Sequence, residues 1–264
     1  MRKRNNDIQL TSYEELLGMD YGTNENTEKI KIVPLTELHT FKDHPFRVVD
    51  DEKMEETTES ICKYGVLVPA IARPRVGGGY ELIAGHRRKR GSERAGKTEM
   101  PVIIRNYTDD EATIIMVDSN IQREDILPSE KAKAYSMKYE AMKHQGKKAG
   151  GSTLDAIGEQ AGESGKTVQR YIWLARLSDE LLEMVDIKKI GFVQGVDISY
   201  LTSEAQGWVF EILSNQKVSI STTQSGKLKE YAKSGELTSA MVYLILSEKK
   251  PKERKVTIKA DKIR

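Results

Sequence analysis

The sequence predicts an α+β protein in which a small mixed α/β N-terminal domain, at residues 30–125, precedes an all-α domain at residues 126–215. Two observations support this division. Between residues 30 and 120, short β-branched and apolar runs alternate with helical patterns, which is typical of a small α/β domain. After Pro128 the apolar spacing is wholly helical, so the second domain is expected to consist of several helices.

The elements of the first domain can be assigned in chain order. Strands are expected where apolar and β-branched residues gather, at residues 32–35, 66–73, 80–84 and 101–107. Asp50 or Asp51 caps a helix that ends at Gly65. A basic helix follows the third strand, and a capping box that begins at Thr108 opens another. Cys62 lies at helical spacing from apolar residues of the first helix, so we expect it to be buried.

Three segments lack a sustained apolar period or are strongly basic. Residues 1–29 are expected to form a flexible tail, and the glycine-rich residues 145–151 a flexible loop. Residues 216–264 are expected to form a C-terminal helical and basic segment. No helical pattern closes the chain at Arg264, which leaves truncation of this segment open.

Charge and hydropathy exclude several classes of protein. Lys and Arg number 42 against 40 acidic residues, a net charge of only +2, so any nucleic-acid surface must be local. No apolar run is long enough to span a membrane, and the N-terminus lacks the apolar core of a signal peptide. We therefore expect a cytoplasmic protein without a membrane partner. The single cysteine also excludes an internal disulfide and a cysteine-based zinc site.

Residues 157–172 carry the most specific local pattern, which resembles the helix-turn-helix of bacterial repressors. Gly162 supplies the backbone freedom of a tight turn, and Ser164 caps the second helix. Val168 and Ile172 then face inward. The polar side chains of the second helix project outward and are expected to bind DNA in a major groove: Ser164, Lys166, Thr167, Gln169 and Arg170.

Gly158 stands where repressors usually carry alanine, and it weakens the first helix by about 1 kcal/mol. An ordinary helical hairpin remains the alternative, although it rarely needs both a small turn residue and a row of polar donors. One such motif reads half of a site, so we expect a homodimer on a palindromic DNA site. Val242, Leu244 and Ile245 can contribute to the dimer, but a role in the core is favoured.

Gly85 and the basic residues 86–90 bring cations to the N-terminal end of a helix. Arginine forks and free helix amides both satisfy phosphate oxygens, so this combination suits phosphate binding. Without a bound anion this arrangement of cations is unfavourable, because the N-terminal end of a helix carries a partial positive charge that repels them. From the residues alone, a solvated basic helix is almost as well supported as a phosphate site.

Four ordered motifs resemble those of ParB-type partition proteins, which join a ParB/sulfiredoxin-like N-terminal domain to a helix-turn-helix domain. Residues 85–90 (GHRRKR) are similar to the family's G-E-R-R-x-R box, and residues 119–125 (SNIQRED) to its E-N-x-Q-R box. Residues 65–69 (GVLVP) are similar to a strand start of the family, and the helix-turn-helix follows in the same order. The resemblance covers residues 32–215.

This resemblance implies a CTP-binding, nucleoid-associated protein that dimerises on a palindromic site and closes into a clamp that slides along DNA. A partner ATPase would move the complex, in the segregation of a chromosome, a plasmid or a mobile element. CTP, accompanied by Mg²⁺, would occupy a small mixed α/β nucleotide-binding domain. Its expected contacts are Gly85, His86, Arg87, Arg88, Arg90, Ser119, Asn120, Gln122 and Arg123.

Two departures from the family boxes bear on hydrolysis. His86 and Ser119 stand where the family has glutamates, so CTP hydrolysis is expected to be slow or absent although binding survives. Glu124 and Asp125 are alternative metal ligands, or they cap the helix that follows.

Two other functions stay open at this point. One is a helix-turn-helix transcriptional repressor without nucleotide switching, and the other is a metal-dependent nuclease, which would need paired acidic residues. A sulfiredoxin-like thiol reductase is excluded, because Gly85 occupies the position of the nucleophilic cysteine.

Overall fold

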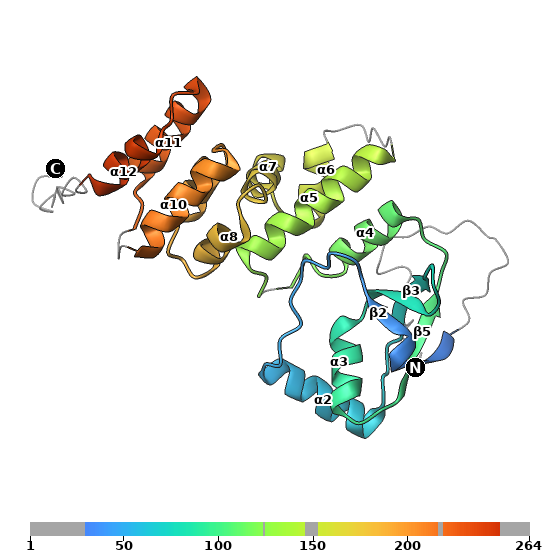
Figure 1. Ribbon diagram of the computed structural model, residues 1–264. Coiled ribbons are helices and arrows are strands. Elements are labelled where there is room, and N and C mark those ends of the chain that lie inside the picture. The colour runs from blue at the N-terminus through green and yellow to red at the C-terminus, as the bar shows by residue number, and fades with distance from the viewer. Residues whose placement is uncertain (1–29, 124, 146–152, 216–218, 249–264) are drawn as a thin grey trace, which may run out of the picture.

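Figure 1 shows the computed structural model, which describes residues 30–123, 125–145, 153–215 and 219–248. A mixed α/β domain is followed by a helical region, so the predicted fold class is confirmed. The expected tail, most of the expected loop and the basic residues 249–264 lie outside the described residues. Among the described residues, no helix is long and apolar enough to cross a membrane.

A five-stranded sheet forms the centre of the N-terminal domain, in the strand order β1-β5-β3-β4-β2. Its strands are β1 (Ile30–Pro34), β2 (Leu38–Thr40), β3 (Ala70–Pro74), β4 (Tyr80–Ala84) and β5 (Glu99–Ile104). The pairs β1–β5 and β3–β4 are antiparallel, whereas β3–β5 and β2–β4 are parallel. Strand β2 and the short 3-10 helix η1 (Leu35–Glu37) before it were not predicted, because elements of three residues carry too little pattern.

Three helices of the described chain complete this domain: α2 (Glu52–Tyr64), α3 (His86–Arg94) and α4 (Asp109–Asp118). Asp51 caps α2, because its carboxylate accepts a hydrogen bond of 2.8 Å from the amide of Met54. The expectation that Cys62 is buried is wrong, since its side chain is exposed. Ile61 occupies the buried position, against Gly91 of α3. One residue turns a side chain by about 100° around a helix, so Cys62 leaves the buried face.

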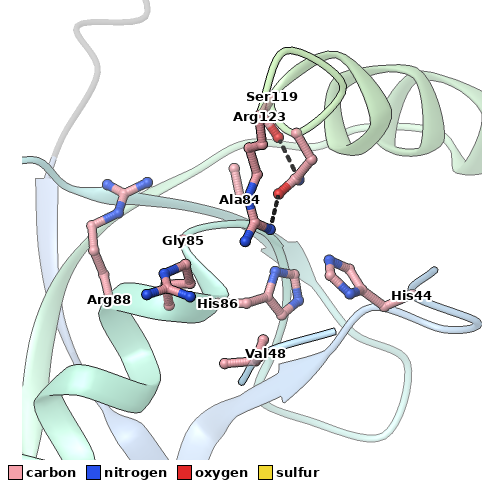
Figure 2. A pocket seen from close by; sticks show the side chains of 10 residues that line it. His44, Val48, Ala84, Gly85, His86, Arg88, Ser119 and Arg123 are labelled. Atoms are coloured by element: carbon pink, nitrogen blue, oxygen red, sulfur yellow. Dashed lines mark hydrogen bonds between the residues drawn. The ribbon is translucent and has the colours of Figure 1, made fainter. Parts of the chain in front are cut away.

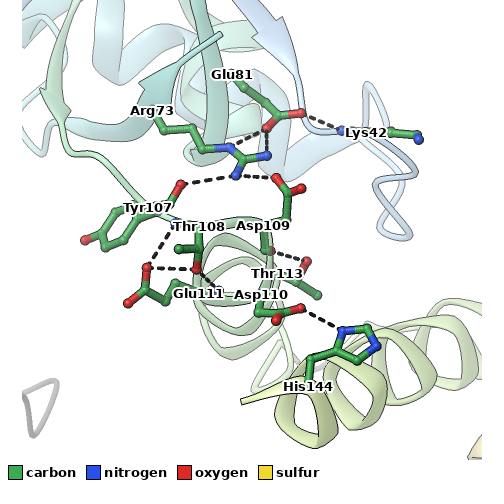
Figure 3. Close-up of polar contacts among 10 residues, drawn as sticks. All are labelled: Lys42, Arg73, Glu81, Tyr107, Thr108, Asp109, Asp110, Glu111, Thr113 and His144. Carbon is green, nitrogen blue, oxygen red and sulfur yellow. Dashed lines mark hydrogen bonds and ion pairs between the residues drawn. The ribbon is translucent and has the colours of Figure 1, made fainter. Parts of the chain in front are cut away.

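A polar cluster ties β3 and β4 to the start of α4 (Figure 3). The guanidinium of Arg73 contacts the Glu81 carboxylate at 2.6 Å and the Asp109 carboxylate at 2.6 Å. Thr108 and Glu111 form the predicted capping box at the first turn of α4. These contacts fix where α4 begins. Residues 85–90 and 119–125 are called the first and second arginine boxes, and the second box follows the other end of α4.

The described helical region runs through α5 (Pro128–His144), α6 (Thr153–Gln160), α7 (Gly165–Leu174), α8 (Asp179–Asp186), α9 (Phe192–Ile198), α10 (Ser203–Asn215), α11 (Thr222–Ser234) and α12 (Ser239–Ser247). The helical domain was expected to end at residue 215. One hydrophobic core contains residues from both sides of that boundary, since Leu213 of α10 and Leu228 of α11 belong to it. Val242 and Ile245 are buried there, which confirms a core role for them, whereas Leu244 is 65% exposed.

A second core connects the sheet domain to the helices. It contains Ile83 of β4, Met116 of α4, Tyr135 of α5 and Val168 of α7. Figure 1 shows α4 beside α5 at the junction. The C-terminal end of α4 therefore lies between the sheet and the helical region.

Candidate nucleotide pocket and DNA-binding helix

The turn between β4 and α3 depends on Gly85. Its φ of 110° lies in the left-handed region, and a Cβ at this position would lie 2.8 Å from the Cβ of Ala70. The register of β3 against β4 shifts between Ile71 and Ala72, near the same turn. The chain can therefore pass tightly into α3, whose first backbone amides have no intrahelical partner.

A cavity of about 200 Å³ lies at this turn (Figure 2). It is lined by His44, Val48, Ala84, Gly85, His86, Arg87, Arg88, Ser119, Asn120 and Arg123. Most of the residues expected from the two arginine boxes thus meet in one cavity. His44 and Val48 were not expected there, because they belong to an irregular segment that lies far from both boxes in the sequence.

Hydrogen bonds to the surrounding chain orient the arginines of α3. The Nη1 atom of Arg88 donates to the carbonyl oxygens of Val68 and Pro69, at 2.7 and 2.5 Å. The Nη2 atom of Arg87 donates to the Asp51 carboxylate at 2.8 Å. This contact holds the pKa of Asp51 below its usual value. Both guanidinium groups are therefore fixed at the cavity wall.

Two residues of the expected set do not line the cavity. Arg90 lies one helical turn beyond His86, and its Nη2 atom donates to the Asp50 carboxylate at 2.5 Å. That contact holds the pKa of Asp50 below its usual value. The side-chain amide of Gln122 donates to the carbonyl oxygen of Gln160 at 3.3 Å, at the end of α6. Arg90 thus faces the start of α2, and Gln122 faces the helical region.

The pocket does not fit a magnesium ion held by the protein. None of the described residues that line it is a carboxylate. The described residues also contain no group of three or more His, Cys, Asp or Glu side chains that could hold a metal. Asp125 pairs with Lys53, and Glu124 lies outside the described residues. Protein magnesium sites usually supply at least one carboxylate in addition to phosphate oxygens, and this pocket supplies none.

Comparisons with known proteins decide the family. Residues 19–121 match the family described as ParB N-terminal domain. The chromosome-partitioning protein Spo0J of Thermus thermophilus is 31% identical over 199 residues, which cover 75% of this chain and 69% of that protein. This chain belongs to the ParB family. The nucleoid occlusion protein of Lysinibacillus sphaericus is 33% identical over 62% of this ParB-family chain, which spans only 52% of that relative's length.

Two solved structures of ParB from Caulobacter crescentus, both C-terminally truncated, are also similar to this ParB-family chain. One is complexed to the centromeric parS site and is 23% identical, covering 76% of this chain and 98% of that chain, with a TM-score of 0.45. The other is complexed with CTP-gamma-S and is 24% identical, covering 77% and 98%, with a TM-score of 0.34. Both TM-scores are below 0.5, so these structures do not place the pocket residues of this chain.

In this ParB-family chain two imidazoles lie side by side in the pocket (Figure 2). The ring centroids of His44 and His86 are 3.9 Å apart, and the ring planes meet at 41°. Burial lowers the pKa of His86 to about 3, and the neighbouring His44, Lys89 and Arg88 add to this effect. Burial also lowers the pKa of His44. Both rings are therefore neutral near neutral pH.

Helices α6 and α7 have the turn glycine and the serine cap that the sequence predicted. Gly162 in the turn has a φ of 67°, and the Ser164 hydroxyl accepts a hydrogen bond of 3.2 Å from the amide of Thr167. Val168 and Ile172 are buried in the second core. On the other side of α7, Lys166 and Arg170 are exposed, while Thr167 and Gln169 are half-buried. The face expected to bind DNA is thus open to a ligand over most of its length.

Lys138 connects α4 to α6. Its side chain is only 4% exposed, and its ammonium contacts the Asp118 carboxylate and the side-chain oxygen of Gln160. Asp118 directly precedes the pocket residue Ser119. This link was not predicted, because lysine on an amphipathic helix is usually solvated.

Proposed function

We propose that this chain is a site-specific DNA-binding partition protein that binds CTP in the pocket at Gly85 and forms a dimeric clamp on DNA. It would act in the segregation of a chromosome, plasmid or mobile element, with a partner ATPase that moves the complex. The observation that carries this proposal is the meeting of both arginine boxes at one cavity beside the start of α3. The Spo0J relative is named a chromosome-partitioning protein, which supports the same role.

The triphosphate would bind at the N-terminal end of α3. Gly85 lines the cavity beside the free amides of the helix, and Arg87, Arg88 and Arg123 supply guanidinium groups. Each charge-assisted hydrogen bond to a phosphate contributes about 1.5–3 kcal/mol. Polar and imidazole side chains complete the wall: His86, Ser119 and Asn120. Cytosine is proposed as the base because the two boxes resemble those through which ParB proteins bind CTP.

Arg90 and Gln122 would act from outside the cavity. Arg90 holds Asp50 at the start of α2, next to the Asp51 that contacts Arg87. Gln122 reaches the end of α6, the first helix of the DNA-binding pair. They would therefore position the arginine boxes instead of contacting phosphate.

CTP hydrolysis would be slow or absent. A water molecule must be oriented and the leaving phosphate neutralised for turnover, and His86 and Ser119 replace the two glutamates of the family boxes. None of the described residues that line the pocket is a carboxylate that could perform this task. A neutral histidine can still accept a proton, so turnover is a separate measurement from binding.

DNA would bind to the outer face of α7, through Ser164, Lys166, Thr167, Gln169 and Arg170. The recognition helix of a helix-turn-helix reads one half-site, so a homodimer on a palindrome is the arrangement that matches two-fold symmetry. Sedimentation that shows a monomer both free and on DNA would remove the dimer from the proposal.

The experiment is calorimetry of the full chain with CTP and the other three ribonucleoside triphosphates, with and without its DNA site. We expect CTP to bind in preference to the others, and phosphate release to be slow. Absence of CTP binding in both conditions would overturn the nucleotide part and leave a repressor-like DNA-binding protein. Fast phosphate release would overturn the prediction about hydrolysis.

A further inference from the structure

His44 and His86, which line the nucleotide pocket, each carry a buried ring nitrogen without a hydrogen-bond partner. Among the described residues, few buried side-chain polar atoms lack a hydrogen-bond partner, and two of them are the Nε2 atoms of His44 and His86. Buried polar groups without a partner are unusual in proteins, and each one requires a physical explanation, such as a catalytic role or contact with an ion. Both residues line the cavity.

The tautomer of His44 is fixed by its neighbour. Its Nδ1 atom lies 2.7 Å from the carbonyl oxygen of Phe46. A carbonyl oxygen can only accept a hydrogen bond, so Nδ1 carries the proton of the neutral ring. The Nε2 atom of His44 therefore carries a lone pair without a hydrogen-bond donor. It can accept a proton without breaking any existing hydrogen bond.

The charged groups around the pair oppose its protonation. Arg123 faces His44 from the turn after α4, and Arg88 and Lys89 act on His86 from α3. Arg87 lines the same cavity, and its contact with Asp51 neutralises part of its charge. No carboxylate lines the described cavity to offset the remaining cations. A bound triphosphate would reverse this balance, because it places several negative charges among the same groups.

We propose that the His44–His86 pair takes up one proton from solvent when a triphosphate enters the pocket, with Nε2 of His44 as the acceptor. This inference rests on the proposed function, since it concerns the same nucleotide site. The protonated Nε2 becomes a donor that a phosphate oxygen can accept from. The pair takes up one proton and not two, because the ring centroids are only 3.9 Å apart and two positive charges would repel.

The sign of the pH dependence follows. Binding of the triphosphate would raise the pKa of the pair, so the affinity for the triphosphate is greatest at low pH. The affinity falls as the pH rises through the pKa that the histidine pair has when the triphosphate is bound. Full uptake of one proton corresponds to about a tenfold change in Kd per pH unit.

The experiment is calorimetry of the full chain with CTP and with inorganic tripolyphosphate, in buffers of different ionisation enthalpy, between about pH 6 and 8. Heat that varies with the buffer gives the number of protons taken up. His44→Asn keeps a donor for the Phe46 carbonyl and removes Nε2, and His86→Gln removes the second ring. His144→Asn is the control, because His144 contacts Asp110 at the far end of α4. The nucleotide itself titrates, with a pKa of about 6 for its terminal phosphate, so the variants are compared at equal pH.

We expect proton uptake in the wild type and in His144→Asn, and less uptake in His44→Asn and in His86→Gln. Thermal melts of each variant establish that it is folded, and the second pocket variant keeps the test decisive where the first is unstable. CTP binding with equal proton uptake in the wild type and in both pocket variants would overturn this inference and leave the proposed function intact. Failure of both CTP and tripolyphosphate to bind would overturn both. Binding of tripolyphosphate without preference for CTP, with uptake lost in the variants, would support this inference and overturn the choice of CTP.

Discussion

Gly158 of α6 packs against the backbone of Glu163 in the turn before α7. The amide of Glu163 donates a hydrogen bond of 2.8 Å to the carbonyl oxygen of Gly158. A Cβ at position 158 would lie 2.3 Å from the carbonyl oxygen of Glu163, a backbone atom that cannot rotate away. The glycine that looked like a weakness of the first helix is thus what allows the two helices to approach.

The variant Gly158→Ala is expected to destabilise the protein. Alanine gains about 1 kcal/mol of helix propensity, but the clash with the turn costs about 1–3 kcal/mol or more, so the melting temperature falls. Gly207→Ala in α10 is the matched control, because nothing lies within 4 Å of the Cβ it adds. That control is expected to raise the melting temperature. Equal changes in both variants would show that the close approach does not matter.

Lys138→Met is expected to lower the free energy of unfolding by about 1–3 kcal/mol near neutral pH. The change leaves the half-buried Asp118 carboxylate without its ammonium partner. Urea unfolding of the variant and the wild type measures the difference.

The deficit of Lys138→Met is also expected to shrink as the pH falls. Burial raises the pKa of Asp118 above 3.8 although Lys138 opposes this, and loss of the lysine raises it further. A carboxyl group with a raised folded-state pKa destabilises the fold above that pKa, and the penalty disappears as the pH falls toward 3.8. Asp118→Asn combined with Lys138→Met is expected to remove this pH dependence. A deficit that stays constant from neutral to acid pH would contradict the assignment.

Arg88→Ala is expected to abolish measurable CTP binding, whereas Arg90→Ala is expected to weaken it much less. Arg88 lines the cavity, but Arg90 is held by Asp50 outside it. Each lost phosphate contact costs about 1.5–3 kcal/mol, or roughly tenfold to a hundredfold in Kd. Calorimetry with CTP on both variants makes the comparison. Equal losses would mean that Arg90 reaches the phosphates in the bound state.

Arg170→Ala is expected to cost about 1–3 kcal/mol of DNA affinity and to relax site preference if the side chain reads a base edge. Lys227→Ala on α11 is the control, because it removes one charge from a side chain of another helix that is 41% exposed. Binding is measured by fluorescence anisotropy at several salt concentrations, and the affinity should fall steeply as salt rises. Unchanged affinity and unchanged preference in Arg170→Ala would remove it from the DNA interface.

Much of the local structure could be predicted because it depends on near neighbours in the chain. The cap at Asp51, the capping box at Thr108 and the cap at Ser164 each involve a side chain and an amide three residues away. The start of β3 was less predictable. The apolar residues from Val66 onward suggested a strand, but regular pairing begins only at Ala70. A strand exists only where a partner is available, and the sequence does not show where pairing begins.

By itself the sequence determined the order of the longer strands and helices of the N-terminal domain, the turn into α7 and the two arginine boxes, since each is a pattern of adjacent residues. Only the tertiary structure decided which of those arginines face a common cavity and which, like Arg90, face another helix. It also placed His44 against His86 and buried Lys138 between α4 and α6. The physical reason is that packing brings together residues far apart in the chain, and their burial and mutual charge depend on neighbours that no local pattern specifies.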